Sequence, residues 1–428
     1  MSPEPTQPVF NTDPATATQL DARDPLAAYR RRFHLPRQAD GTPFIYFCGN
    51  SLGLQPVTTR AYLEQELHDW EHLGVEGHFH AQHPWMPYHE FLAEAMGQVV
   101  GAKPQEVVVM NTLTVNLHLL MVSFYRPTPG RYKILIESDA FPSDRYAVES
   151  QLRFHGYDPA EALLELTPRP GEVLIRKEDI AAMLAEQGAQ IALLMIGGVN
   201  YYTGQYFDLK GITELGHRYG CTVGFDCAHG AGNVPLNLHD SGADFAVWCT
   251  YKYLNAGPGS VAGCFVHERH AETFDGPRFA GWWGHNKTTR FNMRQPFDPM
   301  PGAEGWQLSN PPILSLAAIR ASLDIFAEAG MDQLRAKSLL LTGYLEYLLQ
   351  QIPTDRIRVI TPRDPEERGC QLSIQVRDSD KTLYDELTRK GLLADWREPD
   401  VIRVAPVPLY NSFGDVYRFY ELLHQSLA

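Results

Sequence analysis

Short apolar runs alternate with amphipathic stretches along the chain from about Gln105 onward. The apolar runs predict strands over Glu106–Met110, Tyr132–Glu137, Ile191–Ile196, Thr222–Asp226, Asp244–Trp248 and Ser260–His267. The stretches between them predict helices over Thr114–Phe124, Ser143–Phe154, Lys177–Gln187 and Gly211–Tyr219. Strands that are apolar throughout and separated by helices indicate an α/β fold with a mostly parallel sheet, covered by helices on both faces.

The pattern changes beyond about Arg290. A stretch containing Gly, Pro and Asn leads into two long helical patterns, Ile313–Ala329 and Met331–Gln351, and Gly330 stands between them where a C-cap belongs. The remaining elements are predicted as strands over Arg356–Ile360, Gln371–Gln375 and Ile402–Ala405, and as helices over Thr382–Lys390 and Asp415–Gln425. This order of elements is typical of an α+β segment.

Two domains are the expected organisation. At roughly 150 residues per domain, the 428 residues allow two or three, but the α/β alternation ends only once. We expect a disordered leader over residues 1–24 and a segment over 25–58 that packs with the smaller domain. Residues 59–312 are expected to form the large α/β domain, and residues 313–428 the small C-terminal α+β domain.

The charge and hydropathy of the chain exclude two classes of partner. Lys and Arg number 37 against 51 Asp and Glu, which gives a net charge of −14 and no concentrated basic run for nucleic acid. No apolar stretch reaches the roughly 20 residues that a membrane span needs, and the leader has neither a basic nor an apolar region typical of a signal peptide. The sequence therefore predicts neither a nucleic-acid nor a membrane partner.

Six cysteines are scattered through the chain without a C-x-x-C pair. They are Cys48, Cys221, Cys227, Cys249, Cys264 and Cys370. Most lie inside apolar stretches, which is typical of reduced, buried thiols. We therefore expect a cytoplasmic protein, and the composition of a globular chain favours an enzyme.

An aspartate and a lysine stand out at the ends of two predicted strands. Asp226 ends one apolar strand, and Lys252 follows the next. Open α/β sheets bind ligands at the carboxyl ends of their strands. A pyridoxal phosphate enzyme needs this pair, because the lysine binds the cofactor and shuttles protons while the aspartate keeps the ring nitrogen protonated. An isolated pair of this kind is more often a helix cap and a surface lysine.

A third feature makes the cofactor hypothesis stronger. Thr112 and Thr114 lie between the strand Glu106–Met110 and the helix Thr114–Phe124. The free N–H groups of a helix N-terminus, together with hydroxyls, form an anion site that suits the phosphate of a cofactor. Simple capping by threonine is the commoner event, so it is the combination of features, in this order along the chain, that indicates pyridoxal phosphate.

With these residues in place, the chain resembles the kynureninase family from about Asp24 onward. The matching runs are long and lie in one order: Phe47–Pro56, Leu113–His118, Phe141–Asp144, Phe225–Gly232, Tyr251–Ala256, Gly281–His285, Ser309–Pro312 and Ile402–Asn411. The resemblance implies a pyridoxal phosphate-dependent hydrolase of the aspartate aminotransferase-like fold, known as fold type I. It also implies a homodimer, because active sites in this fold generally lie at a dimer interface.

The resemblance assigns roles to particular residues. Lys252 would hold the cofactor, Asp226 would pair with the ring nitrogen, and Arg403 would bind the substrate carboxylate, a task that suits a bidentate guanidinium. The positions implied to contact the cofactor or frame the site are Leu113, Thr114, Phe141, Pro142, Ser143, Asp144, His229, Tyr251, Trp282 and Asn310. Arg403 stands in an otherwise apolar strand, although a snorkelling edge-strand arginine is the alternative. No metal is expected in this site.

The implied reaction is hydrolysis of the Cβ–Cγ bond of L-kynurenine or 3-hydroxy-L-kynurenine, which yields L-alanine and anthranilate or 3-hydroxyanthranilate. In this hypothesis Lys252 removes the α-proton and Tyr251 acts as the acid and base at the carbonyl that water attacks. Family members that use the 3-hydroxy substrate carry a His after Gly and an Asn before Pro-Pro. His78 and Asn310 match them, so 3-hydroxykynurenine is the favoured substrate, in tryptophan breakdown or pyridine nucleotide synthesis.

Two other functions remain open at this stage. His68, Glu71 and His72 match the H-x-x-E-H pattern of inverted zinc proteases, and further histidines follow at His78, His80, His83 and His89. An exposed, metal-free helix is the commoner explanation of such a run. The other alternative is a related fold type I enzyme such as a cysteine desulfurase-like lyase, which would need a reactive cysteine.

Overall fold

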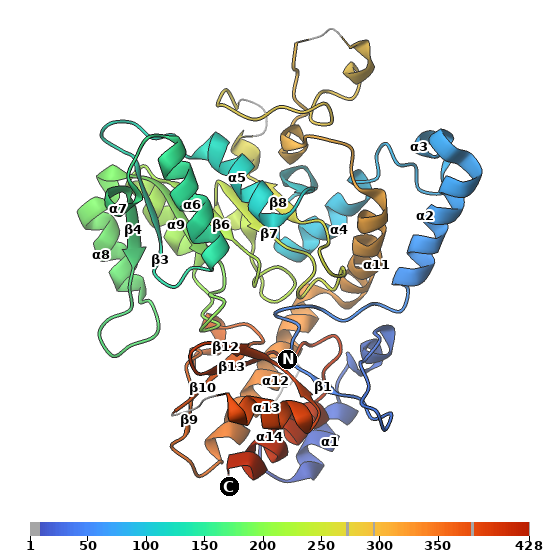
Figure 1. Ribbon diagram of the computed structural model, residues 1–428, viewed down its shortest axis with the longest axis vertical. Coiled ribbons are helices and arrows are strands. Elements are labelled where there is room, and N and C mark those ends of the chain that lie inside the picture. Colours follow the sequence, from blue (N-terminus) through green and yellow to red (C-terminus); the bar gives the residue numbers. More distant parts are fainter. Residues whose placement is uncertain (1–8, 271–273, 294–295, 378–380, 428) are drawn as a thin grey trace, which may run out of the picture.

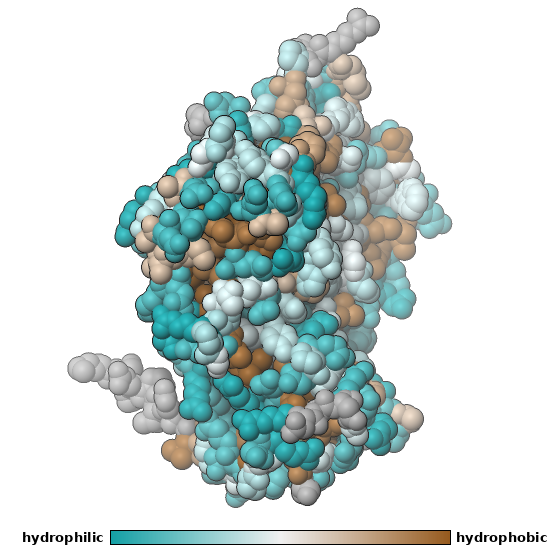
Figure 2. All heavy atoms as spheres, turned by 60° about the vertical axis from the view of Figure 1, so that its left-hand side comes forward, coloured by the Kyte–Doolittle hydropathy of each residue, from teal (hydrophilic) through white to brown (hydrophobic). Residues whose placement is uncertain are grey.

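The computed structural model describes residues 9–270, 274–293, 296–377 and 381–427. Two lobes lie along its long axis, a larger one with a wide sheet and a smaller one that holds the C-terminal elements (Figure 1). The face shown in Figure 2 is mainly hydrophilic, with apolar side chains in separate patches. None of the helices in the described ranges is long and apolar enough to cross a membrane.

The large lobe is built on a mixed sheet of seven described strands in the order β2-β8-β7-β6-β5-β3-β4. The strands are β2 (Val107–Val109), β3 (Lys133–Glu137), β4 (Leu163–Leu166), β5 (Ile191–Gly197), β6 (Thr222–Asp226), β7 (Phe245–Trp248) and β8 (Gly263–Val266). Strands from β7 to β4 run parallel, and β8 runs antiparallel to both of its neighbours. The prediction of a mostly parallel α/β sheet is confirmed.

Helices cover both faces of this sheet, because successive side chains of each strand point to opposite sides. On β3, Ile134 and Ile136 enter one core cluster and Leu135 enters the other. Helices α5 (Leu113–Phe124) and α6 (Pro142–Phe154) contribute to the first cluster, and α8 (Lys177–Gln187) and α9 (Leu209–Arg218) to the second. The short helices of this lobe are α7 (Pro159–Ala162) and α10 (Leu238–Ser241).

The small lobe holds an antiparallel sheet in the order β12-β13-β10-β9. Its strands are β9 (Ile357–Val359), β10 (Leu372–Val376), β12 (Asp395–Arg397) and β13 (Val401–Val404), and its helices are α12 (Met331–Gln350), α13 (Thr382–Arg389) and α14 (Phe413–Leu427). The N-terminal strand β1 (Ile45–Tyr46) pairs in parallel with β11 (Leu392–Leu393). Residues near the start of the chain thus complete the small lobe.

Two predicted boundaries differ from the structure. The leader over residues 1–24 was expected to be disordered, but α1 (Pro14–Ala22) is a helix with Asp13 as its N-cap, and it packs on α14. Residues 1–8 lie outside the described residues. The predicted division at residue 313 comes too early, because α11 (Ile313–Ala329) packs against α2 (Thr59–Leu73) and α4 (Glu90–Val100) and joins the large-lobe core.

Candidate active site

The predicted cofactor residues meet at the carboxyl ends of the parallel strands. β6 ends at Asp226, and Lys252 follows β7. Nine of the predicted residues line one pocket: Leu113, Thr114, Phe141, Ser143, Asp144, Asp226, His229, Tyr251 and Lys252. The arrangement follows from the fold, because parallel strands present their carboxyl ends at a single edge of the sheet.

Lys252 and His229 form the centre of the pocket. The Lys252 Nζ lies 3.0 Å from His229 Nε2, while the buried His229 Nδ1 has no hydrogen-bond partner among the described residues. Burial lowers the pKa of His229 well below its usual value, and the charges of Lys252 and Arg403 add to this effect. A neutral imidazole can accept a hydrogen bond from the Lys252 ammonium, so the pair is stable without a formal ion pair.

Three buried carboxyl groups surround this lysine. Burial raises the pKa of Asp226 and, more strongly, of Asp144, which lies close enough to Asp226 to share a hydrogen bond with it. Burial also raises the pKa of Glu137 to about 7. The pocket therefore keeps carboxyl groups that are short of cationic partners, a condition common at functional sites.

The N-termini of α5 and α6 meet at the same pocket. Thr114 Oγ1 in the first turn of α5 lies 2.8 Å from Ser143 Oγ in the first turn of α6. Neither N-cap, Thr112 or Phe141, caps its helix with a side-chain hydrogen bond in the described structure. Two helix N-termini with two hydroxyls form a suitable site for a dianionic phosphate.

Aromatic rings enclose the lysine. Its Nζ lies 5.9 Å from the centre of the Phe141 ring and 6.0 Å from that of Tyr251. Phe141 contacts Tyr201 edge-on, with ring centres 5.3 Å apart. Burial raises the pKa of the Tyr251 hydroxyl, so this group stays protonated at neutral pH.

Arg403 lies in β13 of the small lobe and reaches across to the large lobe. It is 1% exposed, its Nη2 lies 2.8 Å from Asp395 Oδ2, and its Nη1 donates to the Tyr201 carbonyl oxygen at 2.7 Å. Arg397 contacts the same Asp395 at 3.2 Å. A snorkelling surface arginine is therefore the wrong interpretation, because the guanidinium is buried between the lobes.

Five predicted site residues do not line this pocket, namely Arg403 and four others. Pro142 occupies the first turn of α6 and is exposed, and Asn310 is exposed just before α11. Trp282 is 41% exposed, and its indole donates to the Arg290 carbonyl oxygen. His78 lies in α3 (Gly77–His80), with its ring edge-on to Trp85 at 5.3 Å.

The pocket also contains residues that the sequence patterns did not identify. They are Glu137, Gly197, Val199, Tyr201 and Ala228. Glu137 ends β3 as Asp226 ends β6, so the same strand-end criterion would have identified it. Both oxygens of Glu137 accept from the Gly197 N–H, at 3.1 and 3.2 Å, which ties β3 to the end of β5. Asp395 was missed because nothing in the sequence around an acid in a short strand indicates that it pairs with Arg403.

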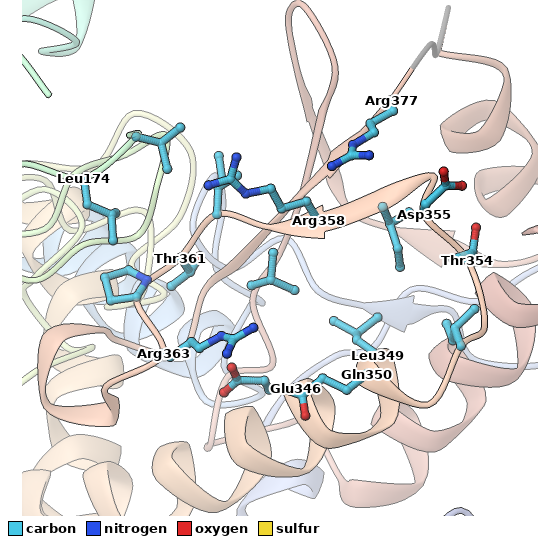
Figure 3. Close-up of a pocket in the computed structure, with 16 residues that line it drawn as sticks. Leu174, Glu346, Leu349, Gln350, Thr354, Asp355, Arg358, Thr361, Arg363 and Arg377 are labelled. Atoms are coloured by element: carbon cyan, nitrogen blue, oxygen red, sulfur yellow. The ribbon is translucent and has the colours of Figure 1, made fainter. Parts of the chain in front are cut away.

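A larger cavity of about 500 Å³ lies elsewhere, in the small lobe beside β9. Leu174 of the large lobe and Glu346, Arg358 and Arg363 of the small lobe are among its lining residues (Figure 3). None of the predicted site residues lines it. Size alone therefore does not identify the site, whereas the chemistry of the lining residues does.

The structure does not favour the two alternative functions. His68, Glu71 and His72 are exposed on α2, where the His72 Nδ1 contacts the His68 carbonyl oxygen at 2.8 Å. They are not among the described trios of side chains close enough to hold an ion. Five cysteines are buried, and burial raises the pKa of the sixth, Cys48, to about 11, so no thiol has the exposure and low pKa of a reactive cysteine.

Comparisons with known proteins agree with this arrangement. The family model for the kynureninase C-terminal domain matches residues 334–423. Proteins named kynureninase from Koribacter versatilis and Myxococcus xanthus are each 60% identical, over 96% and 97% of this chain and 97% of each relative. Another from Nematostella vectensis is 49% identical over 95% of this chain and 92% of the relative.

Solved structures share the fold at low identity. The cysteine desulfurase CsdA from Escherichia coli superposes with a TM-score of 0.75 at 17% identity, over 94% of this chain and 98% of that one. A variant of C-DES with glycine covalently linked to its PLP cofactor gives 0.75 at 17% identity, over 89% and 96%. These neighbours confirm the fold type I architecture.

Proposed function

Because the chain belongs to the kynureninase family, we propose that it hydrolyses the Cβ–Cγ bond of 3-hydroxy-L-kynurenine and of L-kynurenine. The products are L-alanine and 3-hydroxyanthranilate or anthranilate. The protein is an enzyme, and pyridoxal 5′-phosphate is its cofactor. The observation that carries the proposal is that Lys252, Asp226 and the Thr114–Ser143 pair lie in one pocket at the strand ends.

The residues of the pocket fit this cofactor. Lys252 offers an amine for the aldehyde, and Asp226 offers a carboxylate for the ring nitrogen. The phosphate would lie at the N-termini of α5 and α6, where Thr114 and Ser143 can donate. The buried His229 Nδ1, which lacks a partner in the described part of the chain, faces the same space and gives the cofactor a further polar contact.

Bound in this way, the cofactor supplies an electron sink for the negative charge that develops on the substrate. Lys252 would take the proton from the substrate Cα and return it later in the reaction. His229, which is neutral and 3.0 Å from the Lys252 Nζ, orients this amine. The hydrogen bond that Asp144 shares with Asp226 would hold Asp226 in place for the ring nitrogen.

Tyr251 is the proposed acid and base at the γ-carbonyl. Its hydroxyl is half-buried beside Lys252, and its raised pKa keeps the proton on the oxygen until the carbonyl accepts it. As the carbon–carbon bond breaks, the tyrosinate so formed would take a proton from a hydroxyl of the hydrated carbonyl and then deliver it to the alanine portion. Tyr251 would thus perform the proton transfers at the γ-carbonyl and at the alanine portion, whereas Lys252 performs the one at Cα.

Arg403 is the proposed ligand of the substrate α-carboxylate. Asp395 contacts the guanidinium at Nε and Nη2, and the Tyr201 carbonyl oxygen accepts from one N–H of Nη1. A guanidinium has five N–H donors, so one on each terminal nitrogen remains for a carboxylate. Asp395 and Tyr201 fix the orientation of this second donor pair before the substrate arrives.

The preference for the 3-hydroxy substrate rests on His78 and Asn310. The ring of His78 contacts Trp85, which lines an apolar cavity together with Pro312, two residues after Asn310. Neither residue lines the Lys252 pocket of the same chain. The proposal therefore requires a second copy of the chain to bring them to the substrate ring.

A homodimer supplies that second copy. The α2–α3 region exposes Trp70 and Phe79 at 60% and 58%, and the loop with Trp282 exposes Phe279 and Phe291. Exposed apolar side chains in such number are typical of an interface. Mixing Lys252→Ala with Asn310→Ala chains under conditions of subunit exchange should restore the wild-type preference for 3-hydroxykynurenine, because each site that keeps Lys252 would receive Asn310 from the other chain. A preference that stays that of Asn310→Ala would argue against sites shared between chains.

A cytoplasmic location is consistent with this function. All six cysteines are described, and each has a free thiol. Proteins of oxidising compartments commonly pair such residues in disulfides.

Turnover assays test the proposed function directly. The purified, cofactor-loaded enzyme is expected to release alanine and 3-hydroxyanthranilate in equal amounts, with a higher kcat/KM for 3-hydroxykynurenine than for kynurenine. Release of alanine and sulfur from cysteine, without activity on either kynurenine, would instead support a desulfurase.

A further inference from the structure

A buried histidine with a single long polar contact lies outside the active site, just before α4. His89 is 4% exposed, and neither of its ring nitrogens has a hydrogen-bond partner among the described residues. Its Nε2 faces Glu304 Oε1 of the 303–306 turn at 3.6 Å. Glu90, the next residue, completes a group whose ligand atoms all lie within 4.8 Å of one another. A buried polar group without a partner calls for a bound species.

We propose that His89, Glu90 and Glu304 bind a zinc ion. An imidazole and two carboxylates are ligands that zinc accepts, with water in the remaining position. Two ligands each about 2.1 Å from zinc and 3.6 Å apart subtend about 120° at the ion, nearer the tetrahedral angle than the octahedral one. The imidazole ligand favours zinc over magnesium, which prefers oxygen ligands.

A second group of possible ligands shows why this site stands apart. Glu106, His239 and His267 also lie close together. Glu106 already accepts from the backbone N–H groups of Lys103 and Glu268, each at 2.9 Å, and contacts His239 Nδ1 at 2.9 Å. That carboxylate is saturated and needs no ion, whereas within the described ranges His89 Nδ1 has no hydrogen-bond partner and His89 Nε2 has only its 3.6 Å contact with Glu304.

The cations near the site can make room for an ion. Lys287 contacts both oxygens of Glu90 at 3.1 Å, but its side chain is 52% exposed and can turn into solvent. Arg290 donates to the carbonyl oxygens of Trp283 and His285, so its own partners do not depend on the carboxylates. Zinc would replace the ammonium of Lys287 and bind both carboxylates together with the imidazole.

The ion would fix a long segment to the large lobe. Glu304 lies in the chain between Trp282 and Asn310, two residues of the predicted site, whereas His89 and Glu90 begin α4. A zinc ion would join the two segments across more than 200 positions of sequence. The site would be structural, because it lies outside the pocket that holds Lys252.

The test compares two histidine–glutamate pairs of equal separation. In the exposed pair, His80 Nε2 also lies 3.6 Å from a carboxylate, that of Glu76, but both side chains are more than 60% exposed. Cofactor-loaded protein is stripped with EDTA, incubated with ZnCl2 or MgCl2, and analysed for metal content and for Tm. We expect about one equivalent of zinc with a higher Tm, no retained magnesium, and loss of both effects in His89→Ala and Glu304→Gln but not in His80→Ala.

Three results would overturn the proposal. One is the absence of retained zinc in the wild type. Another is equal zinc content in wild type, His89→Ala and Glu304→Gln, which would place the ion elsewhere. The third is a loss of zinc in His80→Ala. Glu304→Gln keeps the shape of the side chain, so a folding defect in His89→Ala would not decide the outcome.

Discussion

Asp226 and Asp244 are buried to almost the same degree, 7% and 6% exposed, on neighbouring parallel strands of one sheet. Asp226 ends β6 at the carboxyl edge, and Asp244 precedes β7 at the opposite edge. Their pKa values nevertheless move in opposite directions. Burial raises the pKa of Asp226, whereas at Asp244 the effect of burial is outweighed and the pKa falls far below its usual value.

The two pKa values differ because different groups contact the two carboxyl groups. The Asp244 carboxylate contacts His217 and His270, each at 2.8 Å, and Arg269 at 2.6 Å, and it accepts from the Val223 N–H. These groups satisfy a permanent negative charge.

Asp226 accepts from the Ala228 N–H and otherwise shares a hydrogen bond with another acid, Asp144. One edge of the sheet thus uses its aspartate for stability, while the other keeps an aspartate short of cations, ready for a positively charged ring nitrogen.

The largest expected effect comes from removing the charge of Asp226, the carboxyl group with few cationic partners. Asp226→Asn should lower kcat/KM by about 10³-fold or more, since the ring nitrogen loses the group that keeps it protonated. Its free energy of unfolding should stay the same or rise, because a buried acid is replaced by a neutral amide. Steady-state kinetics and urea unfolding measure both. Wild-type activity in Asp226→Asn would contradict the functional role assigned to Asp226.

The same substitution at the saturated site should have the reverse outcome. Asp244→Asn leaves Arg269, His217 and His270 without their carboxylate, so unfolding should become easier by about 2–4 kcal/mol. The kcat of the folded fraction should match the wild type, as Asp244 lies at the other edge of the sheet. An unchanged urea midpoint would show that the cluster contributes little.

Tyr251→Phe tests whether the pocket separates cofactor binding from proton transfer. The variant should keep the cofactor absorbance of the wild type while its kcat falls about 100-fold, because the hydroxyl that donates to the carbonyl is gone. Tyr253, fully buried nearby, serves as a control position whose substitution should act on stability instead. A wild-type rate in Tyr251→Phe would remove the tyrosine from the mechanism.

Glu137 extends the comparison to pH. Its pKa is about 7 in the folded chain, against 4.5 for an ordinary glutamate. Between these values the folded state holds a proton that the unfolded state has lost, so stability falls as pH rises.

For Asp244 the sign is opposite. Its contribution to stability is present above pH 4 and is lost as pH falls below that value.

Urea titrations of the cofactor-free protein at pH 5 and pH 7.5 test the assignment to Glu137. The free energy of unfolding should fall by about 2 kcal/mol less in Glu137→Gln than in the wild type over this pH range. If the free energy of unfolding changed with pH in the same way in the wild type and in Glu137→Gln, this assignment would be contradicted.

His78 gives the smallest expected effect. His78→Trp should lower the ratio of kcat/KM for 3-hydroxykynurenine over kynurenine by about tenfold, since a hydrogen-bonding ring is lost. Stability should change little, because the residue lies on a short exposed helix. His80→Trp, two residues on, is the matched control. A ratio that does not change in His78→Trp would remove this residue from ring recognition.

The sequence predicted the elements of the sheet because buried parallel strands are apolar throughout. All six strands predicted for the large lobe are present, with ends that lie within three residues of the predicted ones. β4 was missed, as the run Leu163–Leu166 is interrupted by Glu165, which pairs with Arg145. Helix α4 was missed because the alternation of elements was followed only from about Gln105, and α2 was expected only as a helix around its histidine run. Helix α1 was missed because proline and threonine suggested disorder.

The centre of the site was predictable for a related reason. Asp226 and Lys252 follow strands directly, so the fold fixes where they lie. Glu137 obeys the same rule but was not identified, and Tyr201 and Asp395 depend on contacts between the lobes that no local pattern encodes. His78, Trp282 and Asn310 came only from the resemblance, and the chain on its own does not bring them to Lys252.

The most direct test of the account is to locate the cofactor on the chain. Pyridoxal phosphate-loaded protein is reduced with borohydride, digested and analysed by mass spectrometry, with the visible spectrum recorded before and after reduction. The account predicts a visible band that borohydride abolishes and a pyridoxyl adduct on the peptide with Lys252. A protein without such a band, or with the adduct on another lysine, would contradict it.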